Sequence, residues 1–334
     1  MNVETPLLNG IRPPGNSFVL PEQKMVYISV TKVACTSLRW MVADLAGEDL
    51  ASFYPAIGAQ QTRLMTIHTN RDHWQKSPQI KNTPPEMLRE IHPDNGWFVF
   101  ACVRDPWSRL WSAWQSKFLV RHAFYSDNYA DEPWFPRVPA KPSDVVEDFA
   151  AFVKARPWET HELLQTDWHF QPQVSSVRPD GVNYTRVYDL REFSTLTSDI
   201  RAHLERIGQP RELYLPRANE TPLGLTRETL SDGVAEAIED AYRADFDAFG
   251  ETWSLGSVKY VEDGWTSDAI DHAAYHTAAN ERIGDIRREA RRYRRELERA
   301  QRENELLRAR LARAQSSSQD ARSLVEKVRT RLSR

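Results

Sequence analysis

The chain has 334 residues, a mass of 38.6 kDa and 40% hydrophobic residues, which is enough for one α/β body and an appendage. No stretch approaches the roughly 18–20 uncharged apolar residues that a membrane-spanning helix needs. The first residues lack a basic segment followed by an apolar one, so no secretory leader is expected. The only cysteines, Cys35 and Cys102, exclude a disulfide scaffold and a cysteine zinc cluster, and they indicate a reducing, cytoplasmic setting.

The net charge of −3 conceals two segments of opposite sign. From residue 276 to the end the sequence has 17 Lys and Arg against 9 Asp and Glu, whereas residues 1–275 have 27 against 38. An acidic body is not typical of a general polyanion binder, so nucleic acid is not an expected partner. Any anionic ligand of the body needs a local cationic site.

Short apolar runs alternate with helical periodicity along residues 25–275, which predicts one α/β domain with a mainly parallel sheet. Residues 1–24 are rich in Pro and Asn and are expected to be an irregular lead-in. The elements predicted after them are strands over 26–30, 96–103 and 184–188, and helices from Leu38 to about Gly47, over 106–119, 143–155 and 192–206, and from a Thr226 cap through 227–249 to Gly250.

The first motif that carries chemistry is a polar loop, residues 31–37, between the first predicted strand and helix. A helix N-terminus presents unpaired N–H groups and the positive end of the helix dipole, which suits a phosphate. Lys32 adds charge, and Thr36 and Ser37 add hydroxyl donors. The nucleotide-triphosphate pattern G-x-x-x-x-G-K-[S/T] is absent, and a plain strand followed by a capped helix is the structural alternative.

A second basic motif follows the second predicted strand, where Arg104 precedes a helix that starts at Pro106. The guanidinium of Arg104 can fork onto a phosphate, and Ser112 can add a hydroxyl two helical turns later. Asp105 is expected to cap the helix. Arg109 is predicted to be either a second phosphate contact or a surface ion pair.

Together these motifs resemble carbohydrate sulfotransferases of the chondroitin/dermatan and heparan 2-O type. Lys-Val-Ala-Cys-Thr-Ser-Leu-Arg from residue 32 is similar to their 5′-phosphosulfate loop, and Val-Arg-Asp-Pro-Trp-Ser-Arg-Leu-Trp-Ser-Ala-Trp from residue 103 to their 3′-phosphate motif. Asp-Trp-His-Phe-Gln-Pro-Gln, residues 167–173, resembles their His-Trp-x-Pro-Gln segment, and Tyr188-Asp189-Leu190 their Glu-x-Leu element. The resemblance covers residues 24–250.

The sequence departs from that family at three points. Thr31 replaces the usual proline before the lysine and is expected to loosen the loop slightly. The cysteine pair that follows Pro-Gln in Golgi relatives is missing, as is a membrane anchor. The last two departures fit an intracellular, bacterial-style enzyme.

The resemblance implies a P-loop-like three-layer sulfotransferase fold and the donor 3′-phosphoadenosine-5′-phosphosulfate (PAPS), with a hydroxyl acceptor on a carbohydrate or glycolipid. It implies no metal, since the sulfuryl group carries little charge. The donor would contact the side chains or backbone of Lys32, Ala34, Cys35, Thr36, Ser37, Arg104 and Ser112. Lys32 would also stabilise the leaving phosphate.

The acceptor hydroxyl needs a general base, and histidine is the natural choice near neutral pH. His68 lies between the two phosphate motifs, where heparan 2-O relatives carry their base, and is the first choice. His169 is the second. Among 11 tryptophans most are expected in the core, and Trp134 is the best candidate for an acceptor contact. Arg217-Ala218-Asn219 resembles a late Arg-x-Asn loop of the family and is either a ligand contact or a turn.

Residues 276–334 are rich in Arg, Glu, Ala and Leu and contain no proline, which predicts a separate long helix. Apolar residues recur with 3-4 spacing from Ile283 to Leu332, the signature of a coiled coil, and Asn304 occupies a core position of the type that fixes two parallel strands. We therefore expect a parallel homodimer held by residues 280–315. The alternatives are a solvated single helix, a disordered basic tail and a basic helix on an anionic membrane. Because no phosphate-motif residue lies beyond 274, catalysis is not expected to depend on the tail.

Two other functions remain open at this point. One is a coiled-coil assembly protein whose head binds a nucleotide without turnover. The other is a small-molecule kinase, which the missing triphosphate loop disfavours.

Overall fold

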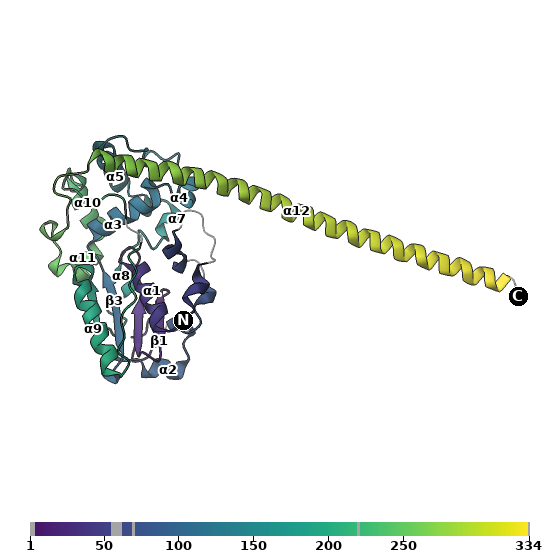
Figure 1. Cartoon of the computed structure of the whole chain (residues 1–334), viewed down its shortest axis with the longest axis horizontal. Helices are drawn as coiled ribbons and strands as arrows, with labels where there is room; N and C mark the ends of the chain where they lie inside the picture. Colours follow the sequence, from purple (N-terminus) through teal and green to yellow (C-terminus); the bar gives the residue numbers. More distant parts are fainter. Residues whose placement is uncertain (1–3, 55–61, 69–70, 219–220, 333–334) are drawn as a thin grey trace. The chain divides into compact units, whose positions relative to one another are not determined.

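The computed structural model describes residues 4–54, 62–68, 71–218 and 221–332. Its centre is a four-stranded sheet in the order β1 (Ser17–Leu20), β2 (Met25–Ile28), β3 (Phe98–Val103) and β4 (Arg186–Asp189). β1 pairs antiparallel with β2, whereas β2–β3 and β3–β4 are parallel. The structure thus confirms a mixed α/β body around a mostly parallel sheet (Figure 1).

The strands are continuous apolar runs because both faces of the sheet are covered. All residues of β1, β2 and β3 are buried, which is typical of central strands in a mostly parallel sheet. Tyr27 of β2 and Phe100 of β3, which are register partners, stack with their ring centroids 5.1 Å apart. Because β2 and β3 are parallel, the loops that follow them leave the sheet at the same edge.

The lead-in over residues 1–24 is not irregular throughout. β1 lies within it, and Leu7 and Leu8 have no exposed surface. Leu8 also forms an isolated antiparallel bridge with Val182. The Pro- and Asn-rich composition hid a four-residue strand whose partner is the following strand.

The helices mostly begin within a few residues of the predicted positions, and α1 starts at Cys35, three residues before the predicted Leu38. Two differences between residues 4 and 266 are larger. The helix expected over residues 227–249 is broken, because Gly233 has a φ of +79° and a short 3₁₀ turn, Glu228–Leu230, precedes it. A short helix also starts the segment expected to be a loop at 125–142. The helices are α1 (Cys35–Leu45), α2 (Pro85–Glu90), α3 (Pro106–Trp114), α4 (Ala123–Tyr129), α5 (Pro142–Ala155), α6 (Pro157–Thr160), α7 (Glu162–Gln165), α8 (Val174–Val177), α9 (Phe193–Arg206), α10 (Val234–Ala241), α11 (Arg243–Phe249) and α12 (Ser267–Leu332).

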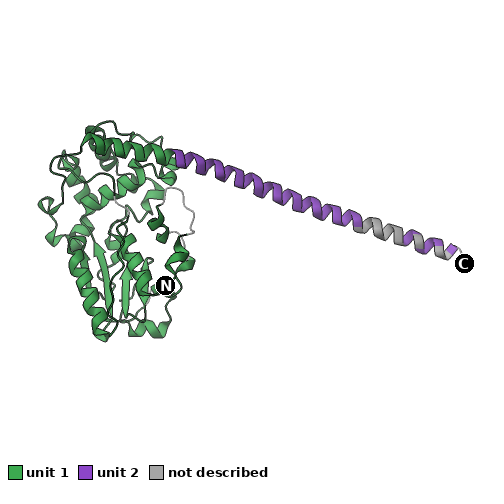
Figure 2. Ribbon diagram, in the orientation of Figure 1, with its two compact units in different colours: residues 1–281 green, residues 282–334 purple. Residues whose placement is uncertain are grey.

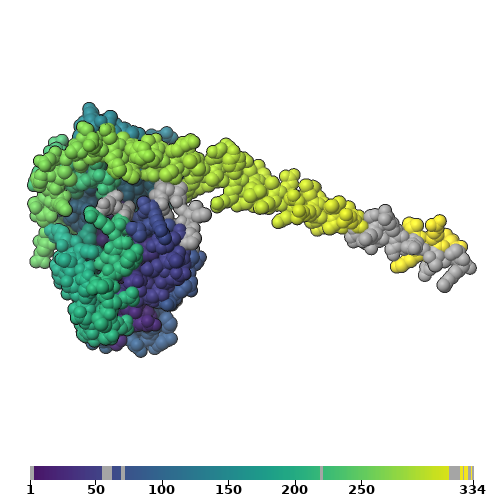
Figure 3. Space-filling model, viewed as in Figure 1, coloured from purple at the N-terminus to yellow at the C-terminus, as the bar shows by residue number. Residues whose placement is uncertain are grey.

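The chain divides into two compact units, residues 1–281 and residues 282–334 (Figure 2). α12 begins at Ser267, before the predicted position 276, so its first four turns belong to the first unit. The described part of the second unit is one uninterrupted helix, whose described side chains are coloured in Figure 3. No helix in the described residues is both long and apolar enough to cross a membrane.

Candidate active site

The loop between β2 and α1 has a strained backbone. Lys32 and Ala34 adopt φ angles of +67° and +47°, which non-glycine residues rarely occupy. Ala34 is the N-cap residue of α1 and offers no side-chain cap. The first-turn N–H groups of α1, from Cys35 to Ser37, are consequently available to an anion, as the sequence predicts.

Lys32 is buried at the base of this loop. Its Nζ donates a hydrogen bond of 2.8 Å to Oγ of Ser116, in the π-helical turn Gln115–Leu119 that extends α3. Burial, and then the charge of Lys117, lower the pKa of Lys32 to about 7. An anion beside Nζ would oppose both effects and raise this pKa, so an anionic ligand stabilises the protonated form of Lys32.

A cavity of about 660 Å³ opens beside Lys32. Cys35, His68 and His169, all predicted site residues, also line it, whereas Arg104 and Ser112 are not among its described lining residues. No Asp or Glu side chain is among those lining residues either. The cavity's basic side chains are Lys32, Arg39, Lys117, His68, His122, His169, His272 and His276. A pocket of this charge inside an acidic body selects anionic ligands.

His169 is oriented by a carboxylate. Its Nδ1 lies 2.7 Å from Oδ1 of Asp167, and the same oxygen accepts the backbone N–H of His169 at 3.0 Å. The Tyr125 hydroxyl donates to the other oxygen of Asp167. Burial opposes the ionisation of Asp167, but the bonds from His169 and Tyr125 outweigh it and hold the pKa of Asp167 at about 2. An ionised Asp167 places the ring proton on Nδ1, which leaves the lone pair on Nε2.

Burial, and then the charge of Lys117, lower the pKa of His169 to about 3, although Asp167 opposes the shift. The ring is therefore neutral at physiological pH, the state that a general base requires.

His68 is held differently. Its Nε2 lies 2.9 Å from the hydroxyl oxygen of Thr36, in the first turn of α1. Burial, and then Arg39, lower its pKa well below the usual value. Both candidate histidines thus reach the cavity, but the Nε2 atom of His68 is engaged by the phosphate loop itself.

The Arg104 motif is supported by a buried amide from the Pro-Gln segment. Gln173 accepts the Arg104 N–H at 2.9 Å and donates to the Arg104 carbonyl at 2.8 Å. Asp245 in turn accepts the backbone N–H of Gln173 at 2.9 Å. Asp105 caps α3 by accepting the Ser108 N–H at 2.7 Å, as predicted. The guanidinium of Arg104 makes no hydrogen bond within the described residues, so its donors are available to a ligand.

Arg109 is neither a surface ion pair nor a phosphate contact, the two roles that the sequence left open. It is 2% exposed, and it donates to the carbonyls of Thr31, Gln171 and Trp168 at 3.1, 2.9 and 2.9 Å. The Thr31 hydroxyl also donates to the Trp168 carbonyl, at 2.5 Å. Thr31 therefore fastens the phosphate loop to the segment that carries His169 rather than loosening it.

Replacing Arg109 by lysine should lower the free energy of unfolding by about 2–4 kcal/mol, because lysine cannot satisfy three buried carbonyls with one fork. Urea denaturation of both proteins measures this loss. Arg211→Lys, at an exposed pair with Asp44, should cost less than about 1 kcal/mol. Equal losses for the two variants would contradict the clamp.

Trp134 is not an acceptor contact. It is 6% exposed and packs edge-on against Phe118 and Phe152, with centroid distances of 5.4 and 5.6 Å. Trp107, Trp111 and Trp114 are core residues, as expected. Of the Arg217-Ala218-Asn219 segment, Asn219 lies outside the described residues.

The sequence reasoning missed several residues of the cavity wall and one residue, Asp167, that supports the wall from behind His169. Ser116 and Lys117 lie one turn beyond Ser112 on the same helical segment, a spacing that could have suggested them. Asp167, two residues before His169, is the kind of neighbour that orients an imidazole. His272 and His276 could not have been placed there, because nothing in the sequence indicates that α12 passes the phosphate loop.

A profile of the sulfotransferase family matches residues 15–250. The chain belongs to this family. A curated relative, carbohydrate sulfotransferase 14 of Danio rerio, is 26% identical over 247 residues, which are 69% of this chain and 60% of the relative. The chain thus spans about three fifths of that relative's length, and no solved structure matches it. The family segment contains β1–β4, both phosphate motifs and His169, but ends before α12.

Proposed function

We propose that the protein is a PAPS-dependent sulfotransferase that transfers a sulfuryl group to a hydroxyl of a carbohydrate or glycolipid. The observation that carries this proposal is the meeting of the Lys32 loop and an Asp167-oriented His169 in one cation-lined cavity. Family membership and the name of the relative support the reaction class and the carbohydrate acceptor. We also propose that the sheet and its helices form the P-loop-like three-layer fold.

The proposed reaction is an in-line transfer at sulfur. The acceptor oxygen forms a bond to sulfur while the bond from sulfur to the 5′-phosphate oxygen breaks, and the acceptor proton moves to Nε2 of His169. The products are a sulfate ester and adenosine 3′,5′-bisphosphate. Lys32 and the first-turn N–H groups of α1 stabilise the charge that develops on the leaving phosphate. No metal has a role in this proposal.

Within this mechanism His169, the second choice from sequence, is preferred to His68 as the base. The Asp167 carboxylate fixes its tautomer and stabilises the imidazolium that forms. Its pKa of about 3 belongs to the cavity without donor, where Lys117 and Lys32 repel a proton. The negative charges of the donor offset that repulsion and make His169 a stronger base. His68 holds Thr36 in the phosphate loop.

The 3′-phosphate is assigned to Arg104 and Ser112, which the buried Gln173 and the helix α3 position. A donor held there and at Lys32 spans both motifs. Two parts of this proposal distinguish a sulfotransferase from the alternatives. The donor of a kinase has no 3′-phosphate, and a head that binds a nucleotide without turnover does not need a base. Incubation with sulfur-labelled PAPS tests it: slow release of labelled sulfate supports an enzyme, and retention of intact donor supports a binder.

Adenosine 3′,5′-bisphosphate should raise the melting temperature far more than ATP does, because a ligand that binds only the folded state stabilises it by mass action. Arg104→Ala should weaken bisphosphate binding by about 2–3 kcal/mol. Thermal melts and calorimetric titration measure the two effects. Equal shifts with ATP and the bisphosphate would exclude the assigned donor. Arg186→Ala, an exposed pair with Glu192, is the control and should leave the affinity unchanged.

We propose a parallel homodimer through residues 280–315. Apolar core positions of the heptads are solvent-exposed in the single chain, with Ile286 at 54%, Leu297 at 59% and Leu311 at 59%. Pairing two such stripes would remove this surface from water. We also propose a cytoplasmic location, which the free, buried thiols of Cys35 and Cys102 support.

Light scattering should report a dimer for the full chain and a monomer for a chain that ends at Glu281. The cut keeps Thr277 and Asn280, whose side chains bond the carbonyls of Leu119 and Val120. Asn304→Leu should preserve association but allow oligomers with more than two helices, because the buried amide no longer specifies a two-stranded coiled coil. A dimeric truncated chain, or a full-length monomer at micromolar concentration, would contradict the helix as the dimerising element.

A further inference from the structure

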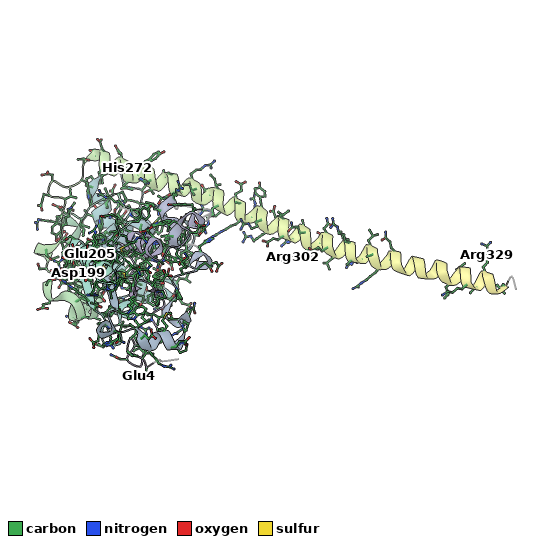
Figure 4. All side chains as sticks on the ribbon, turned by 60° about the horizontal axis from the view of Figure 1, so that its bottom comes forward. Glu4, Asp199, Glu205, His272, Arg302 and Arg329 are labelled. Carbon is green, nitrogen blue, oxygen red and sulfur yellow. The ribbon has the colours of Figure 1, made fainter. Side chains whose placement is uncertain are left out.

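The first turns of α12 form part of the wall of the candidate active site. His272, His276 and Asn280 line the same cavity as Lys32 and His169. All three belong to the compact unit of residues 1–281, and His272 is labelled at the start of α12 in Figure 4. They lie beyond residues 15–250, so this wall is not part of the segment that defines the family. The expectation that catalysis is independent of everything after residue 274 is therefore unsupported.

This wall is anchored at the end of the π-helical turn Gln115–Leu119 that extends α3. Thr277 is fully buried, and its hydroxyl donates to the Leu119 carbonyl at 2.8 Å. Asn280 donates to the Val120 carbonyl at 2.6 Å, and Arg121 pairs with Glu281 at 3.2 Å. The π-helical turn at this contact also carries Ser116 and Lys117. The helix is consequently held in register with the Lys32 side of the cavity.

His272 and His276 form a coupled pair one helical turn apart. Their Nε2 atoms are 3.1 Å apart, so one Nε2–H donates to the lone pair of the other Nε2, which two neutral rings in different tautomers can do. Burial, and then His272, lower the pKa of His276. The other ionisable side chains that line the cavity are the thiol of Cys35 and six basic groups: Lys117, His122, Arg39, Lys32, His68 and His169. No carboxylate lies among the described lining residues, so a bound anion would supply the opposite charge that favours the protonated form of these histidines.

The donor does not account for this half of the cavity. Its 3′-phosphate is assigned to Arg104 and Ser112, which are outside the cavity's described lining, and its 5′ end to Lys32. We propose that His272 and His276 bind an acidic group of the acceptor and so determine which acceptors are used. This inference rests on the proposed function. It adds two specificity-determining residues that lie outside the segment matched by the family profile.

Calorimetric titration of the full chain saturated with adenosine 3′,5′-bisphosphate tests the inference. The two probes are an unsulfated chondroitin tetrasaccharide and the same tetrasaccharide with its carboxylates reduced to alcohols. The acidic probe should bind the wild type about tenfold more tightly, the equivalent of one charge-assisted contact. The double variant His272→Gln/His276→Gln should bind both probes equally. Tyr275→Gln, at a position 74% exposed on the same helix, should keep the preference.

The affinity for the bisphosphate reports folding, and it should be the same in all three proteins. If the double variant loses it, His272→Gln alone is titrated, and a reduced preference is again expected. The inference is overturned if the wild type binds neither probe or both equally, or if a folded variant keeps the full preference. The proposed function fails by a different result, namely the absence of bisphosphate binding and of sulfate release from PAPS. In that case the two probes can still be titrated without nucleotide, so the inference on His272 and His276 is tested independently.

Discussion

His169→Ala should reduce the rate of sulfuryl transfer by about 10²–10⁴-fold, the range that a positioned general base contributes. Bisphosphate affinity should stay close to that of the wild type, because the assigned donor contacts lie elsewhere. Asp167→Asn should cause a smaller loss, since an amide in place of the carboxylate no longer stabilises the imidazolium. Single-turnover assays with saturating PAPS separate this chemical step from donor binding.

His68→Ala is the decisive comparison for that prediction. If the folded His68 variant has no turnover and the His169 variant is active, the general base is His68, the first choice from the sequence. His92→Ala is the control, because His92 caps a turn and is not among the described residues of the cavity. It should keep full activity.

Lys32→Ala should lower turnover by about 10²–10³-fold, because the lost charge faces the leaving phosphate in the transition state. Donor affinity should fall less than turnover, since the interaction strengthens as the phosphate ionises. Lys154→Ala, at an exposed position in α5, is the matched control. Unchanged turnover in Lys32→Ala would remove this residue from the mechanism.

The same residue predicts a pH dependence. Free Lys32 has its pKa lowered to about 7, and only its protonated form attracts the donor. The kcat/KM for PAPS should therefore be constant below pH 7 and fall as pH rises above it, by about tenfold per unit. Lys32→Arg should move this alkaline limb upward, because a guanidinium stays charged. His169 adds no limb between pH 5 and 9, since its pKa of about 3 leaves it neutral there.

Local patterns predicted the parts of the site that are built locally. The apolar run before Lys32 and the polar run after it identified the strand and the loop and placed the start of α1 within three residues. Arg104-Asp105-Pro106 identified the end of β3 and the cap of α3. Each depends on residues within a few positions of one another. Turn chemistry and helix capping operate over this range.

Contacts between distant segments could not be predicted in this way. Asp245 supports Gln173 from 72 residues away, and Arg109 reaches Thr31 across 78. In the sequence Arg109 is one arginine on a predicted helix. Only the folded structure shows that its side chain is buried and donates to three carbonyls. The π-helical turn after Trp114 is also invisible in the sequence, although it points Ser116 toward Lys32.

The carboxylate-free lining of the cavity has a kinetic consequence. Residues 1–275 carry 38 acidic and 27 basic side chains, so an approaching polyanion first meets a repulsive field. At physiological ionic strength this field decays over about 8 Å, and a small nucleotide can diffuse through it to the basic interior. A long nucleic acid cannot enter in the same way, because the phosphates that flank the entering one would stay in the repulsive field. Salt screens both this repulsion and the attraction of the basic cavity, so the rate of association with the donor should depend less on salt than that of an enzyme whose whole surface is basic.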